Sequence, residues 1–454
     1  FCPPATLQQC PMFVVRSNRA EELVEHLAGQ LRVPLSDPFV PEVVAVQSRG
    51  MQRWLSQRLA DRLGVWAHAE HPFPRRLIHD VVAAALGEEA SEALEPTRRE
   101  RMAWLLSQRL PELCQGEPFD TVRRYLHDDP GGLKRMQLAT QLAERFDQYL
   151  VYRPELMLAW DGGAEPGDWQ AEAWRAVREV AGSDHVAARI HRALRRSSWP
   201  TERLPERVSL FGVATLPPMY LHVLGRLAEH VPVHLYVLAA SEQWIADLRP
   251  RRRRKRPSMA QVHAEEGNPL LAAWGRLARD LQAVLEELDY GSVERFVAPP
   301  PTPVCTTLQL LQADMFHVVA RKPATGAAQL DLVPSHDEVL GPVALPADRS
   351  LLLHRCHSPM REVEVLASEL RRLFDADPGL EPHDVVVMTP DIETYGPLVR
   401  AVLGAEVQKR LVHVHGSSNS LVSIDDAKAS SAERPKTSTM WLAAFPYVAR
   451  RGLC

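Results

Sequence analysis

The sequence predicts an α/β fold with parallel strands, into which a long helical segment is inserted. Short β-branched apolar runs alternate with helices of amphipathic periodicity near both ends of the chain, for example over 13–31 and 351–374. The turns between these runs are short, as in the strand–helix–strand units that build parallel sheets. Residues 78–200, by contrast, are rich in Leu, Ala and Arg and almost free of strand patterns.

The first strand is expected over residues 13–16, and a helix follows over 20–31, where Leu23, Leu27 and Leu31 recur every four residues. The tripeptide Ser17-Asn18-Arg19 separates them. Nucleotide hydrolases carry a phosphate loop at this junction, built from glycines, a Lys and a Ser or Thr. No Gly-Lys-Ser/Thr occurs in the 454 residues. We therefore expect a degenerate nucleotide loop at Ser17, Asn18 and Arg19, and a binding subunit on the scaffold of an enzyme.

A second unit of the same kind begins near Pro41. Residues 42–47 read as a buried strand, Ser48-Arg49-Gly50 as a turn, and 51–63 as a helix. The parallel layer is expected to resume after the helical insertion. Its further elements are a strand over 208–216, a helix over 217–230 opened by prolines, a strand over 231–239 and one amphipathic helix over 268–288.

Pro-rich connectors at 298–303 and 322–349 lead to a second α/β lobe. Its expected elements are a strand over 351–358, a helix over 361–374, a strand over 384–388 and a helix over 395–403. We assign 12–340 to the first domain, including the helical insertion at about 78–200, and 345–404 to the start of the second. Residues 1–11 are expected to be a non-native leader, and 405–454 a disordered or non-native tail, because both lack a structural pattern.

Composition narrows the function classes. With a net charge of −4, nucleic-acid binding requires local basic patches. The six cysteines include no CxxC pair, so zinc ribbons and a disulfide framework are disfavoured and a reducing cytoplasm is expected. No apolar run approaches the about 18 residues of a membrane span. His354 and Cys356 share a strand face while His357 points away, so they predict no metal site.

Read together, several segments resemble the amino-terminal part of the RecC (gamma) subunit family of exonuclease V, the RecBCD helicase–nuclease. The resemblance covers about residues 12–404, and it depends on the order and spacing of the segments, since each alone is a weak motif. They are SNRAEELVEHL, DPFVPEVVAVQSRGMQRWLSQRLADRLG, FDQYLVYRPELMLAW, GVATLPPMYLHVLGRL, GNPLLAAWGRLARDL, HRCHSPMREVEVL and PHDVVVMTPDIETYGPLVRAVLG.

The resemblance implies an inactivated superfamily-1 helicase fold, similar to the P-loop NTPases. It implies a non-catalytic scaffold that splits the DNA duplex at a fork, threads the 3′-ended single strand and scans it for the Chi recombination hotspot in double-strand-break repair. The implied partners are a RecB-like helicase–nuclease and a RecD-like helicase, which would use the ATP and Mg²⁺. No cofactor, metal, catalytic residue or membrane contact is expected in this chain.

Candidate DNA-binding residues gather at two places. Gln47, Ser48, Arg49 and Arg53 surround a strand-to-helix junction, where α/β folds bind ligands. Glutamine and serine can read base edges, and arginine can bind phosphate or guanine. Ordinary turn and helix-surface chemistry explains the same pattern from composition alone, but the resemblance places this segment along the scanning channel. Family members often carry uncharged residues at the two arginine positions, so this chain is expected to read a different hotspot.

The second place is the segment 147–153. Asp147 could accept from a base amine, Arg153 could bind phosphate, and Tyr149 and Tyr152 could stack on bases. The alternative is a helix end with an Asp–Arg surface pair and buried tyrosines. Weaker transfers from the family are Phe73 and His79. The run Arg251, Arg252, Arg253 and Arg254, continued by Lys255 and Arg256, is either a solvated loop or a phosphate contact without sequence preference.

Two other functions remain open at this point. An autonomous helicase or nuclease is disfavoured by the missing phosphate loop and by the lack of an acidic Mg²⁺ motif; Asp128-Asp129 lies beside Pro130-Gly131-Gly132 and reads as a turn. A structural interaction protein without DNA contact is disfavoured by the arginine run and the polar strand end.

Overall fold

The computed structural model describes residues 12–88, 97–248, 267–299, 306–320, 348–380, 385, 387–389 and 391–411. Its contacts divide the chain into two compact units, one of Phe1–Gln47 and Met51–Val297, the other of Ser48–Gly50 and Ala298–Cys454. The division falls earlier than the expected domain boundary near residue 340. The expected leader at 1–11 lies outside the described residues, as does 412–454 of the expected tail.

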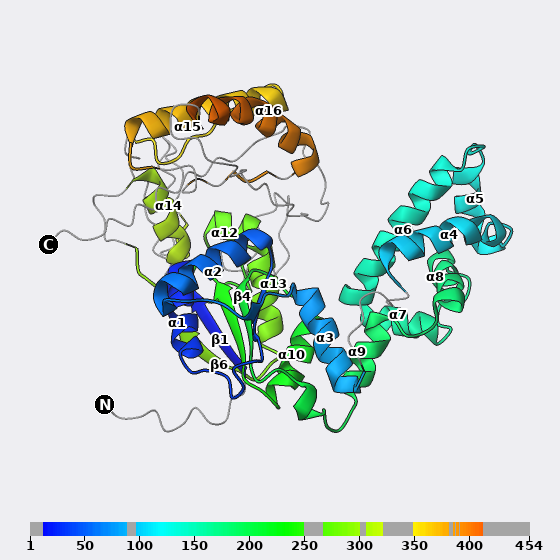
Figure 1. Ribbon diagram of the computed structural model, residues 1–454. Helices are drawn as coiled ribbons and strands as arrows, with labels where there is room; N and C mark the ends of the chain where they lie inside the picture. The colour runs from blue at the N-terminus through cyan, green and yellow to red at the C-terminus, as the bar shows by residue number, and fades with distance from the viewer. Residues whose placement is uncertain are drawn as a thin grey trace, which may run out of the picture. The chain divides into compact units, whose positions relative to one another are not determined.

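The first unit contains a six-stranded sheet in the order β3-β2-β4-β5-β1-β6, and every pairing in it is parallel. The predicted parallel α/β class is therefore confirmed. Because the strands are parallel, their carboxyl ends all meet at one edge of the sheet, visible around β1 and β4 in Figure 1. The strands are β1 (Met12–Ser17), β2 (Glu42–Val46), β3 (Ala69–Glu70), β4 (Val208–Val213), β5 (Val233–Leu238) and β6 (Gly291–Glu294).

Helices cover both faces of this sheet. Side chains of successive strand residues alternate between the faces, so Val14 and Leu235 pack into one core while Val15 and Tyr236 pack into the other. The smaller core includes α1 (Ala20–Leu31) and α2 (Arg49–Leu63). The larger core includes α3 (Pro74–Leu86), α10 (Pro218–Ala228) and α13 (Arg276–Leu285), and it continues without a break into the helices between β3 and β4.

These intervening helices pack on one another through aromatic and polar contacts. Asp161 at the end of α7 accepts from Trp174 Nε1 at 2.9 Å and lies 2.6 Å from Nε2 of the fully buried His185. The other ring nitrogen of His185 caps α9 by accepting from the Ala188 amide. The elements are α4 (Arg99–Leu113), η2 (Glu117–Phe119), α5 (Asp120–Leu126), α6 (Leu133–Tyr152), α7 (Pro154–Asp161), α8 (Trp169–Ala181), α9 (Val186–Leu194) and η3 (Thr201–Arg203).

A buried polar cluster lies beneath α1. The imidazole of His234 in β5 stacks on Phe13 of β1 at 5.3 Å between ring centroids, and it stacks on Tyr236 at 6.4 Å. Burial, followed by the positive charges of His26 and Arg207, lowers the pKa of His234 from 6.5 to about 4. His234 is therefore a neutral core residue at neutral pH.

Two predicted helix boundaries are corrected. Helix α2 begins at Arg49, so Arg49 and Gly50 belong to its first turn and not to a preceding loop. The single helix expected over 268–288 is two helices, α12 (Pro269–Trp274) and α13, which meet at Gly275. A side chain at Gly275 would approach the Leu271 carbonyl to 2.5 Å. The buried Arg279 also donates to that carbonyl and to Ala272 O, which compensates for the broken helix.

In the second unit the described residues form helices α14 (Thr307–Phe316), α15 (Pro359–Ala376) and α16 (Ile392–Leu411). The strand predicted over 351–358 is wrong, because none of these residues belongs to a strand. Residues 353, 355 and 357 are exposed and those between them are half-buried, but this alternation occurs without a strand partner in the described part. Of the strand predicted over 384–388, only 385, 387 and 388 are described, and these three belong to no strand. Helix α16 also continues to Leu411, beyond the break expected at residue 405.

Candidate functional site

The β1–α1 junction, where a phosphate loop would lie, is filled by the chain itself. Ser17 Oγ donates to Arg295 O at 2.8 Å. The Asn18 amide makes two bonds with the backbone of Val297, donating to its carbonyl at 2.9 Å and accepting from its amide at 3.0 Å. These side chains are therefore occupied by the segment that continues from β6, and Ser17 Oγ also accepts from the Arg19 amide at 3.0 Å.

The amino-terminal end of α1 is also unsuited to an anion. Arg19 occupies the N-cap position without a side-chain cap, and Glu21 and Glu22 lie in the first turn. Glu22 pairs with Arg295 at 3.6 Å. Carboxylates complement the positive end of a helix, so they occupy the electrostatic position that a phosphate would need.

The next junction, at the carboxyl end of β2, is arranged differently. Gln47 is exposed, yet both ends of its amide are used: Nε2 donates to Thr215 O at 2.9 Å and Oε1 accepts from the Ala214 amide at 3.5 Å. This side chain ties the end of β2 to the loop after its neighbour β4. Ser48, which is half-buried, then leads into α2.

Arg49 and Arg53 are exposed in the first two turns of α2. They are four residues apart, so they share one face of the helix. In the described part of the chain neither guanidinium makes a hydrogen bond or an ion pair. The first turn of α2 contains no acidic residue. Unlike α1, this helix end therefore combines a positive dipole with two available guanidinium groups, which is an arrangement that binds phosphate.

The β3–α3 junction lies directly beside β2, because the Val46 amide donates to Pro72 O at 3.1 Å. The following residue, Phe73, is the N-cap of α3, and 45% of its surface is exposed. An exposed phenyl ring is a surface on which an unpaired base can stack. His79 lies six residues further along the chain, in α3, and is half-buried.

Asp147 reaches this junction from α6. Its carboxylate pairs with Arg75 of α3, with Nη1 at 2.9 Å from Oδ1 and at 3.3 Å from Oδ2. Arg153, at the end of α6, instead places its guanidinium over the Tyr149 ring, 5.5 Å from the centroid. The alternative of an Asp147–Arg153 pair with two buried tyrosines is thus not observed, since Tyr149 is half-buried and Tyr152 is exposed.

The structure therefore connects the two places that the sequence singled out. The Val46 amide of β2 donates to Pro72 O, two residues before α3 begins, and Arg75 of α3 forms an ion pair with Asp147 of α6. We name the members of this site that lie in the first unit the carboxyl-edge cluster: Gln47, Arg53, Phe73, Arg75, Asp147 and Arg153. Ser48 and Arg49 lie at the start of α2, next to Gln47 along the chain. The sequence analysis did not identify Arg75. The one available signal was its position: it is a basic residue in the first turn of a helix, and the amino-terminal end of a helix favours acidic residues.

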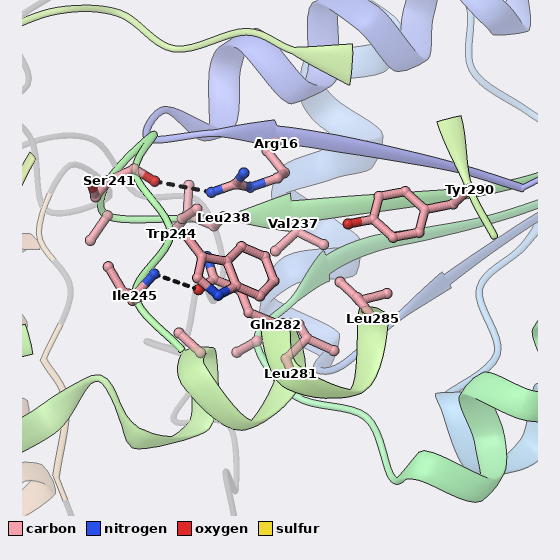
Figure 2. Close-up of a pocket in the computed structure, with 14 residues that line it drawn as sticks. Arg16, Val237, Leu238, Ser241, Trp244, Ile245, Leu281, Gln282, Leu285 and Tyr290 are labelled. Carbon is pink, nitrogen blue, oxygen red and sulfur yellow. Dashed lines mark hydrogen bonds between the residues drawn. The ribbon is translucent and has the colours of Figure 1, made fainter. Parts of the chain in front are cut away.

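A small pocket lies further along the same edge, at the carboxyl end of β5 (Figure 2). Arg16, Trp244, Gln282 and Tyr290 line it together with apolar side chains. Arg16 donates to Ser241 O at 3.3 Å, and the Gln282 side-chain oxygen accepts from the Ile245 amide at 3.1 Å. Arg16 thus ties the loop after β5 to β1, and Gln282 ties it to α13, and we assign no ligand to this pocket.

The remaining candidates from the sequence are the basic run, a metal site and a membrane span. The basic run lies outside the described residues, and it includes Arg251, Arg252, Arg253 and Arg254. Within the described ranges there is no group of three or more His, Cys, Asp or Glu with metal-binding geometry. Leu352, His354 and Cys356 line one small cavity in the second unit, so His354 and Cys356 lie on one side as expected, although the segment forms no strand. No helix in the described part is long and apolar enough to cross a membrane.

Comparison with known proteins gives a consistent result. The family profile described as "RecC, N-terminal domain" matches residues 12–318. The protein "RecBCD enzyme subunit RecC" of Escherichia coli (strain K12) is 33% identical over 437 residues, which cover 86% of this chain and 38% of that protein. The proteins of the same name from Haemophilus influenzae and Mycolicibacterium smegmatis are 31% and 33% identical, over 87% and 86% of this chain and 39% and 34% of those proteins. The chain thus spans less than two fifths of the length of these relatives.

Proposed function

Since the chain belongs to the RecC family and matches its amino-terminal domain, we propose that it is a non-catalytic, DNA-binding and scaffolding part of a RecBCD-type helicase–nuclease complex. In this proposal it holds one single strand of an opened duplex along the carboxyl-edge cluster and scans that strand for a hotspot sequence. Its partners are RecB-like and RecD-like subunits, and the complex acts in recombinational repair of double-strand breaks.

The observation that carries this proposal is the pair of exposed guanidinium groups at the positive end of α2. Arg49 and Arg53 have no acidic partner in the described residues, whereas Arg62 in the same helix pairs with Glu25 and Arg75 pairs with Asp147. Phosphates of a DNA backbone are suitable ligands for such groups. Phe73 at the β3–α3 junction adds an exposed ring on which a base can stack, and Arg153 at the end of α6 adds a further cation.

The β1–α1 junction supports the non-catalytic role. We infer that the sheet is an inactivated superfamily-1 helicase domain in which the side chains of Ser17 and Asn18 close the nucleotide site. ATP and Mg²⁺ would then be bound by the partner subunits. The alternative of an autonomous helicase or nuclease requires a phosphate site, and the acidic first turn of α1 opposes one.

We expect Arg49→Ala and Arg53→Ala each to weaken binding of single-stranded DNA about tenfold at low salt, because each removes a charge-assisted hydrogen bond. The dependence of log K on log salt should flatten by about one unit per lost phosphate contact. Fluorescence anisotropy of labelled oligonucleotides over a salt series measures both. The matched control is Arg58→Ala in the same helix, where the guanidinium lies 3.9 Å from Asp61 and over the Trp54 ring.

Three results would reject parts of this proposal. If the parent chain does not bind DNA, a structural role without DNA contact replaces it. If Arg58→Ala weakens binding as much as the other two variants, α2 contributes only diffuse charge. Magnesium-dependent ATP hydrolysis by the purified chain, lost on changing Asn18, would favour the autonomous helicase; we expect hydrolysis to stay at background.

A further inference from the structure

We propose that Arg75 is a specificity-determining residue of the carboxyl-edge cluster, because it orients Asp147 as an acceptor for an exocyclic amine of a DNA base. This inference rests on the proposed function and deepens it by naming the base chemistry that the cluster prefers. Arg75 would not itself recognise the base. It acts through Asp147, so it is a positioning residue.

The ion pair has the geometry of a partly open site. Nη1 of Arg75 lies 2.9 Å from Oδ1 of Asp147 and 3.3 Å from Oδ2, so one guanidinium nitrogen holds both oxygens. The Arg75 and Asp147 side chains are 41% and 24% exposed. A pair buried on all sides would be closed to a ligand, whereas two fully solvated side chains would not be held in one orientation. This pair is fixed and still accessible.

Helix stability alone does not account for Arg75. It is the second residue of α3, after the N-cap Phe73 and Pro74, and the first turn of α3 contains no acidic residue. A cation near the amino end of a helix opposes the helix dipole. Asp147 from α6 supplies the negative charge that the first turn lacks. The ion pair with Asp147 therefore explains an arginine at this position better than a contribution to the stability of α3 does.

The positive charge of Arg75 compensates the negative charge of Asp147. An isolated carboxylate repels the phosphates of a DNA strand, so Asp147 would oppose binding unless its charge were compensated. With Arg75 beside it, the pair is neutral, and the carboxylate oxygens keep lone pairs that can accept further hydrogen bonds. Cytosine N4 and adenine N6 are exocyclic amines that donate such bonds, whereas thymine has no exocyclic amine and offers only a carbonyl and a methyl group at its major-groove edge. The cluster should therefore prefer cytosine or adenine to thymine.

The test compares binding of oligo(dC) and oligo(dT) of equal length to the full chain by fluorescence anisotropy at fixed salt. The readout is the ratio of the two dissociation constants. We expect the parent to favour oligo(dC) several-fold. Both Arg75→Ala and Asp147→Ala should bring the ratio close to one, and the double variant should change it no further. Arg75→Ala should also weaken binding of both oligonucleotides, because it leaves an uncompensated carboxylate, whereas Arg75→Lys should restore part of the preference.

Arg76→Ala is the matched control. Arg76 is the next residue of α3 and pairs with Asp80 of the same helix at 3.1 Å, so its loss should leave the ratio unchanged. A lower thermal midpoint for Arg75→Ala with an unchanged ratio would show that the pair only ties α3 to α6, and the inference would be overturned. A parent that binds DNA without any preference would also reject it while leaving the proposed function standing. A parent that binds no DNA would reject the proposed function itself.

Discussion

Replacing Asp161 with Ala is expected to lower the free energy of unfolding by about 3–5 kcal/mol. One carboxylate accepts from Trp174 of α8 and faces the fully buried His185 at the start of α9, so the variant leaves two buried polar groups without a partner. Burial raises the pKa of Asp161, but the hydrogen bonds from His185 and Trp174 outweigh burial and hold the pKa below its ordinary value. The carboxylate is therefore charged at neutral pH and acts as the common acceptor of three helices.

Chemical denaturation of the full chain, followed by circular dichroism, measures this loss. The matched control is Asp128→Ala in the connection between α5 and α6, where 87% of the side chain is exposed. That variant should change the stability by less than about 0.5 kcal/mol. Asp161→Asn should lie between the two, because an amide keeps one acceptor oxygen. Equal stabilities of Asp161→Ala and Asp128→Ala would show that the network contributes nothing.

Acidification should destabilise the first unit through His234. Its pKa is about 4 in the folded chain and about 6.5 when exposed, so the unfolded chain binds more protons between these values. Stability is therefore fully present above pH 6.5 and falls as the pH is lowered towards 4. A shift of this size corresponds to about 3 kcal/mol. The pKa of His26, beside it on α1, is lowered by burial and then by the charge of Arg295, and it acts in the same direction.

Unfolding curves at a series of pH values between 7 and 4 (about the span of the two pKa values) provide the measurement. His234→Gln removes the titrating group and should flatten the pH dependence, leaving the contributions of His26 and His71, whose pKa values burial also lowers. His191→Gln, at an exposed position in the last turn of α9, should keep the full dependence of the parent. A parent-like slope in His234→Gln would assign the acid sensitivity to carboxylates elsewhere.

Local sequence signals were sufficient for the elements with strong periodicity. The bounds of α1 agree with the leucine spacing, and the strands next to it were recognisable from β-branched runs. Strands β3 and β6 could not be predicted, because Ala69–Glu70 and Gly291–Glu294 have neither the length nor the apolar character of a strand, and only the neighbouring backbone makes them pair. The break at Gly275 was hidden for a similar reason, since it depends on Arg279 folding back on α12.

In the candidate site, too, some residues could be predicted from local sequence signals, whereas others depend on long-range contacts. Arg49, Arg53 and Asp147 could be proposed from the sequence, because residue type, position along an element and the family resemblance all point to a polar edge. The partner of Asp147 lies 72 residues away in α3, so no local pattern could name Arg75. Likewise, the amide of Gln47 turned out to bind the loop after β4. Long-range pairing decides which polar side chains remain available to a ligand, and a single sequence contains no direct record of it.

The closed β1–α1 junction has a consequence for motion. A ligand shifts a conformational equilibrium only by as much as it binds one state better than another. In a nucleotide-driven motor, the ligand is the nucleotide, and its difference in affinity for the two states arises at the phosphate loop. Here the side chains of Ser17 and Asn18 are bonded to the segment Arg295–Val297 that follows β6, so in our proposal no nucleotide enters this junction to change these contacts. In the proposed complex this unit would therefore act as a stator: it keeps one conformation while the partner motor subunits move the strand past it. Any pause at a hotspot would then come from tighter binding of the strand by this unit.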